Sequence, residues 1–419
     1  MTSVIIGSGP AGVYAAETIR ARLPDEPVIM VSRDSAPAGS PVMLTYWLSG
    51  KYDPRRLYFR DAAWAEKNRI TLKTGAEAVS LETSAGRIVL GSGESLPYDR
   101  LLVASGTSAI ALPFPGGDSQ GVGFFRHLHD AQAFLQDETG VKQVAIIGAG
   151  FIGLKLACHL SEKGVRVTLL EKESRLAARI FDEAISRRVA ETLRENGIRV
   201  ETGVEVGEIL NQRGRVSGIR LKDGRIYDCQ RVIQALGVQP NVRFLQDSGI
   251  ALQRGIVVND RMQTNIAGIY AAGDVTVSID SITGEPLNNA TWPAATRQGT
   301  VAGSNMAGAN RRYLHNFPVN ALDLFDLRVM AAGHPLLNPE PGINVFIEEK
   351  PHAYRKLVTR SGALIGFLLG GDVAGAGILL NAIKSGKKFD CPPAGDSFFL
   401  QNRVPPNLGY RRRHIFSSG

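Results

Sequence analysis

Cysteine is scarce in this sequence, since its 419 residues contain only Cys158, Cys229 and Cys391. The three lie far apart and form no Cys-x-x-Cys pair, which excludes a disulfide scaffold and a zinc ribbon and fits a reducing cytoplasm. Histidine is sparse too, and only His127 and His129 stand close together. We interpret these two as surface residues of a loop that enters a helix. The sequence therefore predicts a cytoplasmic protein without a metal site.

Long apolar runs are almost absent as well. The N-terminus has no basic region ahead of an apolar core, so no signal peptide is expected. Residues 362–383 form one stretch apolar enough to suggest a membrane helix, but Asp372 follows a Gly-Gly pair at its middle. We predict a strand, a turn at Gly370–Asp372 and a helix from about Val373 instead, and therefore no membrane span.

Acidic residues are fewer than basic ones: the sequence has 40 Asp and Glu and 48 Lys and Arg, which gives a formal net charge of +8. A basic surface suits nucleic acid, an acidic protein or an anionic cofactor, and it equally serves solubility alone. No basic stripe interleaved with aromatic residues supports nucleic-acid binding, so we do not expect it. A chain of this length exceeds a single core, and two or three domains are expected.

Glycine, in contrast, is in mild excess, with 46 residues. In "SVIIGSGPAG" the apolar run Val4–Ile6 predicts a buried strand, and a segment with helical periodicity follows. The turn between them has the spacing Gly7-x-Gly9-x-x-Gly12. Glycines there keep the turn tight, let a pyrophosphate approach the N–H groups at the helix start, and let the helix pack closely on the strand. The pattern predicts a dinucleotide site.

The same pattern occurs again in "QVAIIGAGFIG", as Gly148-x-Gly150-x-x-Gly153. The strand that follows ends at Glu171, whose carboxylate suits the ribose hydroxyls of NAD and repels the extra phosphate of NADP. Basic residues nearby leave NADP(H) open as the less favoured cofactor. In the first copy the matching position is Ser32, a weaker ribose partner than a carboxylate.

Two dinucleotide units in one chain suggest two different dinucleotides. The economical pair is a bound flavin and a diffusible nicotinamide, with hydride passing between them. Between the two copies, the segments 70–82 and 87–106 have the pattern of short alternating strands with glycine turns, which predicts an antiparallel insert.

Four further motifs follow in order: "LPYDRLLVASG", "GIYAAGDV", "TWPAATRQGTVAGSNMAG" and "NALDLFDLRVMAAG". With the first glycine turn they resemble the two-dinucleotide-binding-domain flavoproteins of the pyridine nucleotide-disulfide oxidoreductase superfamily. Within it the sequence is most similar to NADH-dependent rubredoxin and ferredoxin reductases, NADH oxidases and the nitrite reductase flavin domain. The resemblance implies an α/β fold with two Rossmann-like dinucleotide-binding domains, for FAD and NAD, plus a C-terminal α+β domain.

The resemblance also implies domain boundaries and binding residues. The FAD-binding domain would be discontinuous, over 1–112 and 240–316, with the NAD-binding domain at 113–239, a C-terminal domain at 317–390 and a basic tail at 391–419. It implies FAD contacts at Gly7, Ser8, Gly9, Pro10, Ala11, Gly12, Ser32, Arg33, Ala78, Ala104, Ser105, Gly106, Gly273 and Asp274. It implies NAD contacts at Gly148, Gly150, Phe151, Ile152, Gly153, Glu171 and Gly237.

Two departures from the family pattern bear on the chemistry, and the first concerns charge. The helix after the NAD turn carries a Glu in the family, near the flavin and an opposing Lys. Here that position is Lys155, and Lys51 is the candidate for the opposing residue. Either one cation points away, or the pocket holds extra positive charge that would raise the flavin potential. Lys155 reaching to solvent is the structural alternative. Trp292 is a candidate for covering the flavin, or else it packs between domains.

The second departure concerns the redox cysteine of the family's oxidases and peroxidases, whose place is taken by Val42 in "PVMLTY". Valine has no redox chemistry, and Cys158 is expected to pack as a small hydrophobic residue on the NAD-domain helix. We predict no catalytic nucleophile, because hydride transfer needs none, and we expect electrons to leave the flavin directly.

These observations lead us to expect an FAD-dependent NAD(H) oxidoreductase whose partner is an iron–sulfur electron-transfer protein or subunit. It would be of rubredoxin or ferredoxin type, or part of a larger complex such as an aldehyde oxidoreductase. An acidic partner suits the basic chain, with the tail segment 410–416 as one docking element. Two alternatives stay open: an NADH oxidase that reduces dioxygen to peroxide, and an NADH-sensing regulatory binding flavoprotein. The oligomeric state, including a homo-oligomer, also stays open.

Overall fold

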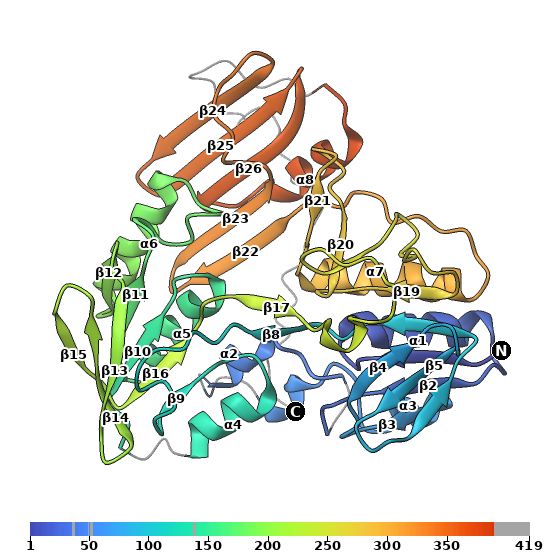
Figure 1. The fold of residues 1–419 in the computed structure, drawn as a ribbon. Coiled ribbons are helices and arrows are strands. Elements are labelled where there is room, and N and C mark those ends of the chain that lie inside the picture. The colour runs from blue at the N-terminus through green and yellow to red at the C-terminus, as the bar shows by residue number, and fades with distance from the viewer. Residues whose placement is uncertain (36–37, 49, 51–52, 137–139, 389–419) are drawn as a thin grey trace, which may run out of the picture.

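The computed structural model describes residues 1–35, 38–48, 50, 53–136 and 140–388. Lys51, Cys391 and the predicted basic tail lie outside these residues. Three five-stranded sheets organise the fold, and Figure 1 shows them in three parts. The first part is built from two separate stretches of the chain, because β19 and α7 return to it after the second sheet. The predicted mixture of parallel strands and covering helices is confirmed, whereas the domain boundaries stay predictions.

The first sheet is parallel throughout, with strand order β19-β7-β1-β2-β3. Its strands are β1 (Ser3–Ile6), β2 (Val28–Val31), β3 (Ile70–Lys73), β7 (Arg100–Val103) and β19 (Ile269–Ala271). Helices α1 (Pro10–Arg22) and α7 (Trp292–Met306) pack against each other almost backbone to backbone. A Cβ on Gly299 would lie 2.1 Å from the carbonyl oxygen of Ala11, so only glycine allows this approach.

The antiparallel insert is smaller than predicted. It contains β4 (Ala78–Glu82), β5 (Arg87–Leu90) and β6 (Ser95–Pro97). The segments 70–73 and 100–103, which we expected in the insert, instead form β3 and β7 of the parallel sheet. Short apolar strands look alike in sequence, and the neighbours available in the fold decide which sheet they join.

Short elements complete this part of the chain. They are α2 (Met43–Leu48), η1 (Pro54–Leu57), α3 (Trp64–Lys67), η2 (Arg243–Leu245), β18 (Ile256–Val257), β20 (Thr276–Ile279) and β21 (Pro286–Leu287). The last three strands form a small sheet of their own beside α7 (Figure 1).

The second large sheet is also parallel, with order β12-β11-β10-β16-β9. Its strands are β9 (Val122–Gly123), β10 (Gln143–Ile147), β11 (Arg166–Glu171), β12 (Arg199–Thr202) and β16 (Arg231–Gln234). Its helices are α4 (Leu128–Gln136), α5 (Phe151–Glu162) and α6 (Glu183–Glu195). An antiparallel sheet follows, of β13 (Val206–Gln212), β14 (Arg215–Leu221) and β15 (Ile226–Asp228).

Two crossing strands join the first two parts. Strand β8 (Thr107–Ala109) leaves the first sheet, and β17 (Val238–Pro240) returns from the second. They pair antiparallel across the middle of the molecule (Figure 1). The predicted return crossing near Pro240 is confirmed.

The third large sheet is antiparallel, with order β22-β23-β26-β25-β24. It consists of β22 (Val319–Leu324), β23 (Leu327–Gly333), β24 (Ile343–Lys350), β25 (Ala353–Arg360) and β26 (Ala363–Gly371), with α8 (Ala376–Ser385) packed against it. The apolar stretch 362–383 is thus a strand, a turn and a helix, as predicted. The helix begins at Ala376 and not Val373, because Gly375 precedes it in the left-handed conformation (φ 82°). Among the described residues, no helix is long and apolar enough to span a bilayer.

Candidate functional site

A cleft of about 940 Å³ opens where β1 and β2 end and α1 begins. Nearly all residues predicted to contact FAD meet there, although they come from five separate stretches of the chain. Its lining includes Gly7, Ser8, Gly9, Pro10, Ala11, Ser32, Arg33, Ala78, Ala104, Ser105, Gly106, Gly273 and Asp274. We call it the cofactor cleft. Its individual FAD contacts stay predictions.

The first glycine turn has the geometry of a phosphate cradle. Gly7 has φ 106°, and a Cβ there would lie 2.1 Å from the carbonyl oxygen of Ala104. A Cβ on Gly12 would lie 2.0 Å from the carbonyl oxygen of Gly7, so this glycine lets α1 pack on the turn and does not line the cleft. A Cβ on Gly9 meets nothing within 4 Å. Gly9 also caps α1 without a side-chain hydrogen bond, which leaves the helix start available to an anion.

Ser32 at the end of β2 has a partner inside the protein. Its Oγ lies 2.7 Å from the Oγ of Ser8, and both residues are buried at the floor of the cleft. The two hydroxyls satisfy each other, so Ser32 does not need a ribose to avoid an unpaired polar atom.

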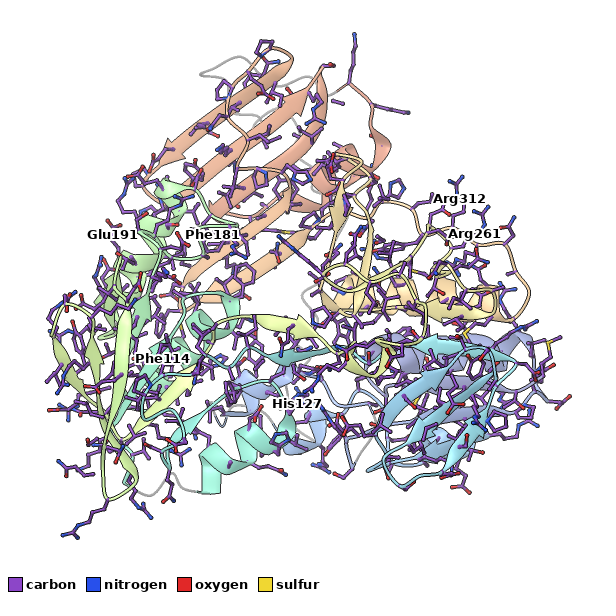
Figure 2. The ribbon with its side chains drawn as sticks, viewed as in Figure 1. Phe114, His127, Phe181, Glu191, Arg261 and Arg312 are labelled. Atoms are coloured by element: carbon purple, nitrogen blue, oxygen red, sulfur yellow. The ribbon has the colours of Figure 1, made fainter. Side chains whose placement is uncertain are left out.

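Arg126 is a residue of this site that the sequence analysis missed. Its Nη2 donates to the Asp274 carboxylate at 2.9 Å and to the Thr107 hydroxyl at 2.7 Å, and it lines the cofactor cleft. The neighbouring His127 lines it too and lies between the first two parts of the molecule (Figure 2), whereas His129 is exposed. His127 thus lies in a loop that enters a helix, as predicted, but it is only partly exposed and faces the cleft. Burial lowers the pKa of His127 below its ordinary value.

Little in the sequence indicates that Arg126 or His127 belongs to the site. Arg126 precedes α4, in a segment with no glycine motif, and only the return of the chain toward the first sheet brings it to Asp274. A lone arginine between two apolar stretches is as common on a solvated surface as in a site.

The second glycine turn repeats the geometry of the first. Gly148 has φ 102°, and Gly153 packs against its carbonyl oxygen, where a Cβ would lie at 2.0 Å. A Cβ on Gly150 meets nothing within 4 Å, and Gly150 caps α5 without a side-chain hydrogen bond. This second helix start is therefore also available to a pyrophosphate.

Glu171 lies beside that turn. Its Oε2 accepts the N–H of Ala149 at 2.7 Å, and its Oε1 accepts the N–H of Glu173 at 2.9 Å. These bonds fix the carboxylate at the end of β11, where the family pattern places a ribose. Phe151 and Ile152 are half-buried in the first turn of α5. Gly237, with φ 106°, lies in the loop between β16 and β17, where its carbonyl accepts the N–H of Ile110.

The three residues predicted to lie near the flavin have different positions in the structure. Trp292, at the start of α7, lines the cofactor cleft and makes an edge-to-face contact with Phe59, with ring centroids 4.8 Å apart. Lys155 does not line the cleft. Its Nζ donates to the Tyr46 hydroxyl at 2.6 Å, so its charge is held between α5 and α2 and not in open solvent. Lys51, the predicted opposing cation, lies outside the described residues.

The two thiols in the described part of the chain do not line this cleft. Val42, which we predict to replace the family's redox cysteine, lines the cofactor cleft. Cys158, on α5, and Cys229 are buried among apolar side chains, as predicted for Cys158. Burial raises the pKa of each thiol to about 12. Of the two cysteines in the described part of the chain, neither lines the cleft.

Each of the two parallel sheets ends in a glycine turn that opens a helix, and the strands β8 and β17 join the two sheets. This arrangement is typical of a protein that binds two dinucleotides. Residues 1–299 match the family model described as pyridine nucleotide-disulphide oxidoreductase. The chain belongs to this family, and it is an FAD-dependent NAD(H) oxidoreductase. The predicted family, fold class, enzyme class and cofactors are thereby confirmed.

Relatives with known names are consistent with membership of this family. The chain is 30% identical to the epsilon subunit of NADH-dependent phenylglyoxylate dehydrogenase from Aromatoleum evansii, over 85% of this chain and 84% of that one. It is 32% identical to an NADH oxidase from Methanocaldococcus jannaschii, over 75% and 71%. Among solved structures, a ferredoxin reductase from Rhodopseudomonas palustris superimposes with a TM-score of 0.83 at 26% identity, over 91% of this chain and 95% of that one.

Proposed function

We propose that this protein passes electrons between NAD(H) and an iron–sulfur protein or subunit by way of FAD. The partner class is supported by two relatives, one a ferredoxin reductase and the other a subunit of a larger NADH-dependent dehydrogenase. The second relative favours a place inside a complex, and an acidic partner surface suits the net charge of +8.

One observation carries the proposal. The position of the family's redox cysteine is Val42, and the thiols of Cys158 and Cys229 are buried away from the cofactor cleft. Because a thiol acts as a nucleophile only when deprotonated, a pKa of about 12 leaves these two cysteines inert at neutral pH. The described residues thus offer no cysteine relay, which supports direct transfer of electrons from the flavin to an outside acceptor.

The residues of the chain would bind the two cofactors, orient them and shield their reactive ends from water. FAD, when bound, takes up two electrons as hydride and can release them one at a time. The uncapped starts of α1 and α5 would hold the two pyrophosphates, and Glu171 would orient a ribose. Asp274, fixed by Arg126, would hold the middle of FAD. Trp292 would exclude water from the cofactor's reactive end, since hydride transfer needs close contact in a dry site.

The experiment uses the full chain loaded with FAD and reduced by NADH in the absence of oxygen. It is mixed in a stopped-flow instrument with a purified ferredoxin or rubredoxin, and with a partner recovered from native extract by pull-down. We expect the flavin absorbance to return on mixing, with matching reduction of the iron–sulfur centre. Reoxidation that occurs only when dioxygen is admitted, with one peroxide per NADH, contradicts the proposal.

That same outcome would support the second candidate, an NADH oxidase that forms peroxide. The relative from Methanocaldococcus jannaschii is named an NADH oxidase, which favours dioxygen as an acceptor. The two candidates share every cofactor contact and differ only in the acceptor, so oxygen consumption that added ferredoxin leaves unchanged distinguishes them.

A further inference from the structure

The two segments that cross between the first two sheets form a short ribbon. Strand β8 lies in the segment 104–112 and β17 in the segment 234–241, and we call the two segments together the crossing. The antiparallel pairing covers three residues on each strand. A ribbon of two strands is only marginally stable by itself, so other contacts have to hold the crossing in place.

The crossing lies against both glycine turns. At its start in the first sheet, the carbonyl oxygen of Ala104 would lie 2.1 Å from a Cβ on Gly7. At its start in the second sheet, the carbonyl oxygen of Ala235 would lie 2.5 Å from a Cβ on Gly148. Each turn therefore touches the backbone at one end of the crossing, and the crossing sets the position of one turn relative to the other.

One end of the crossing is held by Asn241. Its Nδ2 donates to the carbonyl oxygen of Ser105 at 2.8 Å, and its Oδ1 accepts the hydroxyl of Ser108 at 2.7 Å. Its backbone N–H donates to the Gly106 carbonyl at 3.0 Å, and its own carbonyl accepts the Ser105 hydroxyl at 2.9 Å. These hydrogen bonds join residues up to 136 positions apart, at the end of the crossing that lies beside the first glycine turn.

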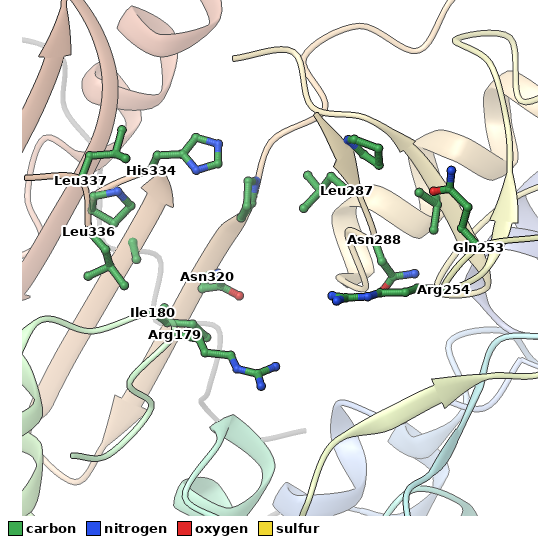
Figure 3. Close-up of a pocket in the computed structure, with 16 residues that line it drawn as sticks. Arg179, Ile180, Gln253, Arg254, Leu287, Asn288, Asn320, His334, Leu336 and Leu337 are labelled. Atoms are coloured by element: carbon green, nitrogen blue, oxygen red, sulfur yellow. The ribbon is translucent and has the colours of Figure 1, made fainter. Parts of the chain in front are cut away.

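The other end is held by Gln234, the last residue of β16. This residue is only 3% exposed, and its Oε1 accepts the N–H of Leu112 at 3.0 Å. Gln234 lines neither the cofactor cleft nor a second cleft of about 940 Å³, which lies between Arg179 and Arg254 (Figure 3). Its amide therefore acts on the crossing itself and not on a ligand in either cleft.

We propose that Gln234 and Asn241 are positioning residues for hydride transfer between the two dinucleotides. Each side-chain amide fixes one end of the crossing, and each end touches one glycine turn. Reacting groups have to be held about 3–3.5 Å apart, and a misplacement of about 1 Å can slow a step about a hundredfold. A loosened crossing lets the two turns shift relative to each other. This role concerns the exchange between NAD(H) and FAD, so it goes beyond the proposed acceptor.

The test uses the full chain loaded with FAD and mixed with NADH in a stopped-flow instrument without oxygen. The main variant is Gln234→Leu, which keeps most of the side-chain volume and removes the acceptor oxygen. A milder second variant, Ser108→Ala, removes one hydrogen bond at the Asn241 end. The matched control is Gln230→Leu. The Oε1 of Gln230 also accepts backbone N–H groups, but this residue stands at the opposite end of β16 and lines neither cleft.

We expect the limiting rate of flavin reduction to fall about tenfold or more in Gln234→Leu and about threefold or more in Ser108→Ala. In Gln234→Leu the dissociation constants of NADH and FAD should stay within about twofold of the wild-type values, since a positioning residue affects the step and not the binding. Amide hydrogen exchange of the crossing, measured without NADH, should be about tenfold faster in both variants. The control should keep the wild-type rate and the wild-type exchange.

An unchanged limiting rate in both variants overturns the proposal, and so does an equal loss in the control. A loss of rate in Gln234→Leu that comes with an equal loss of NADH or FAD affinity also overturns it, because the amide then acts on binding. Flavin absorbance and the melting temperature show that each protein is folded and loaded, and Ser108→Ala carries the test if Gln234→Leu does not fold. Reduction of an iron–sulfur partner is measured separately, so failure here leaves the proposed function standing.

Discussion

The guanidinium group of Arg126 lies 2.9 Å from the carboxylate of Asp274, and the two residues are 148 positions apart in sequence. Arg126 precedes α4 beside the second sheet, and Asp274 follows β19 of the first. Both side chains are mostly buried and line the cofactor cleft. The ion pair therefore ties the two dinucleotide-binding halves together at the place where FAD is predicted to lie.

Replacing Arg126 with Gln is expected to weaken FAD binding about tenfold or more, because Asp274 then keeps a buried charge without its partner. FAD release can be followed by flavin fluorescence during dilution. Arg215→Gln, far from the cleft, is the control. An unchanged FAD dissociation constant in Arg126→Gln would show that the ion pair is only structural.

The first glycine turn offers a matched pair of substitutions. Gly7→Ala is expected to destabilise the fold by about 2 kcal/mol or more, since its Cβ would meet the Ala104 carbonyl and its φ is positive. Gly9→Ala is expected to fold normally, because its Cβ enters open space, and to lose FAD affinity where that Cβ meets the phosphate. Urea unfolding and flavin titration separate the two effects. The reverse ranking would contradict the cradle geometry.

Lys155 and Tyr46 are expected to stabilise each other by about 1 kcal/mol. The ammonium group both donates to the hydroxyl and lies 4.4 Å from the ring centroid. Unfolding of Lys155→Met, Tyr46→Phe and the double variant gives the coupling energy as a double-mutant cycle. A coupling near zero would mean that the cation is held by something other than Tyr46.

The buried thiols are expected to resist alkylation. With a pKa of about 12, Cys158 and Cys229 have almost no thiolate at pH 7.5, and both are buried. Iodoacetamide treatment of the native protein, read by peptide mass spectrometry, should leave both unmodified until denaturant is added. Rapid labelling of either residue in the native state would reopen the question of a thiol relay.

Acid is expected to destabilise the contact between α1 and α3. Burial alone would raise the pKa of Glu17, but hydrogen bonds from Arg60 and Trp64 hold it below its ordinary value of 4.5. A lowered pKa stabilises the fold above the unfolded value, and this contribution is lost as pH falls through the folded pKa. Glu17→Gln should lower stability at pH 7 by roughly 1–2 kcal/mol and flatten the acid slope below pH 4.5 in urea titrations. Parallel slopes for the two proteins would be inconsistent with this role.

The sequence by itself determined the features that local patterns carry. The glycine spacings at Gly7 and Gly148 predicted both helix-opening turns, because only residues without a Cβ fit those positive φ angles and close contacts. The Gly-Gly-Asp break predicted a strand and a helix in place of a membrane span. The missing cysteine at Val42 is likewise a property of one position, and it needed no structure to be recognised.

Only the tertiary structure decided what distant segments do together. The strands 70–73 and 100–103 joined the parallel sheet because buried neighbours were available there. Arg126 became part of the site because the fold places the segment before α4 beside Asp274, which follows β19 of the first sheet. Contacts between distant segments depend on the order in which the strands and helices pack. Local sequence patterns do not determine that order.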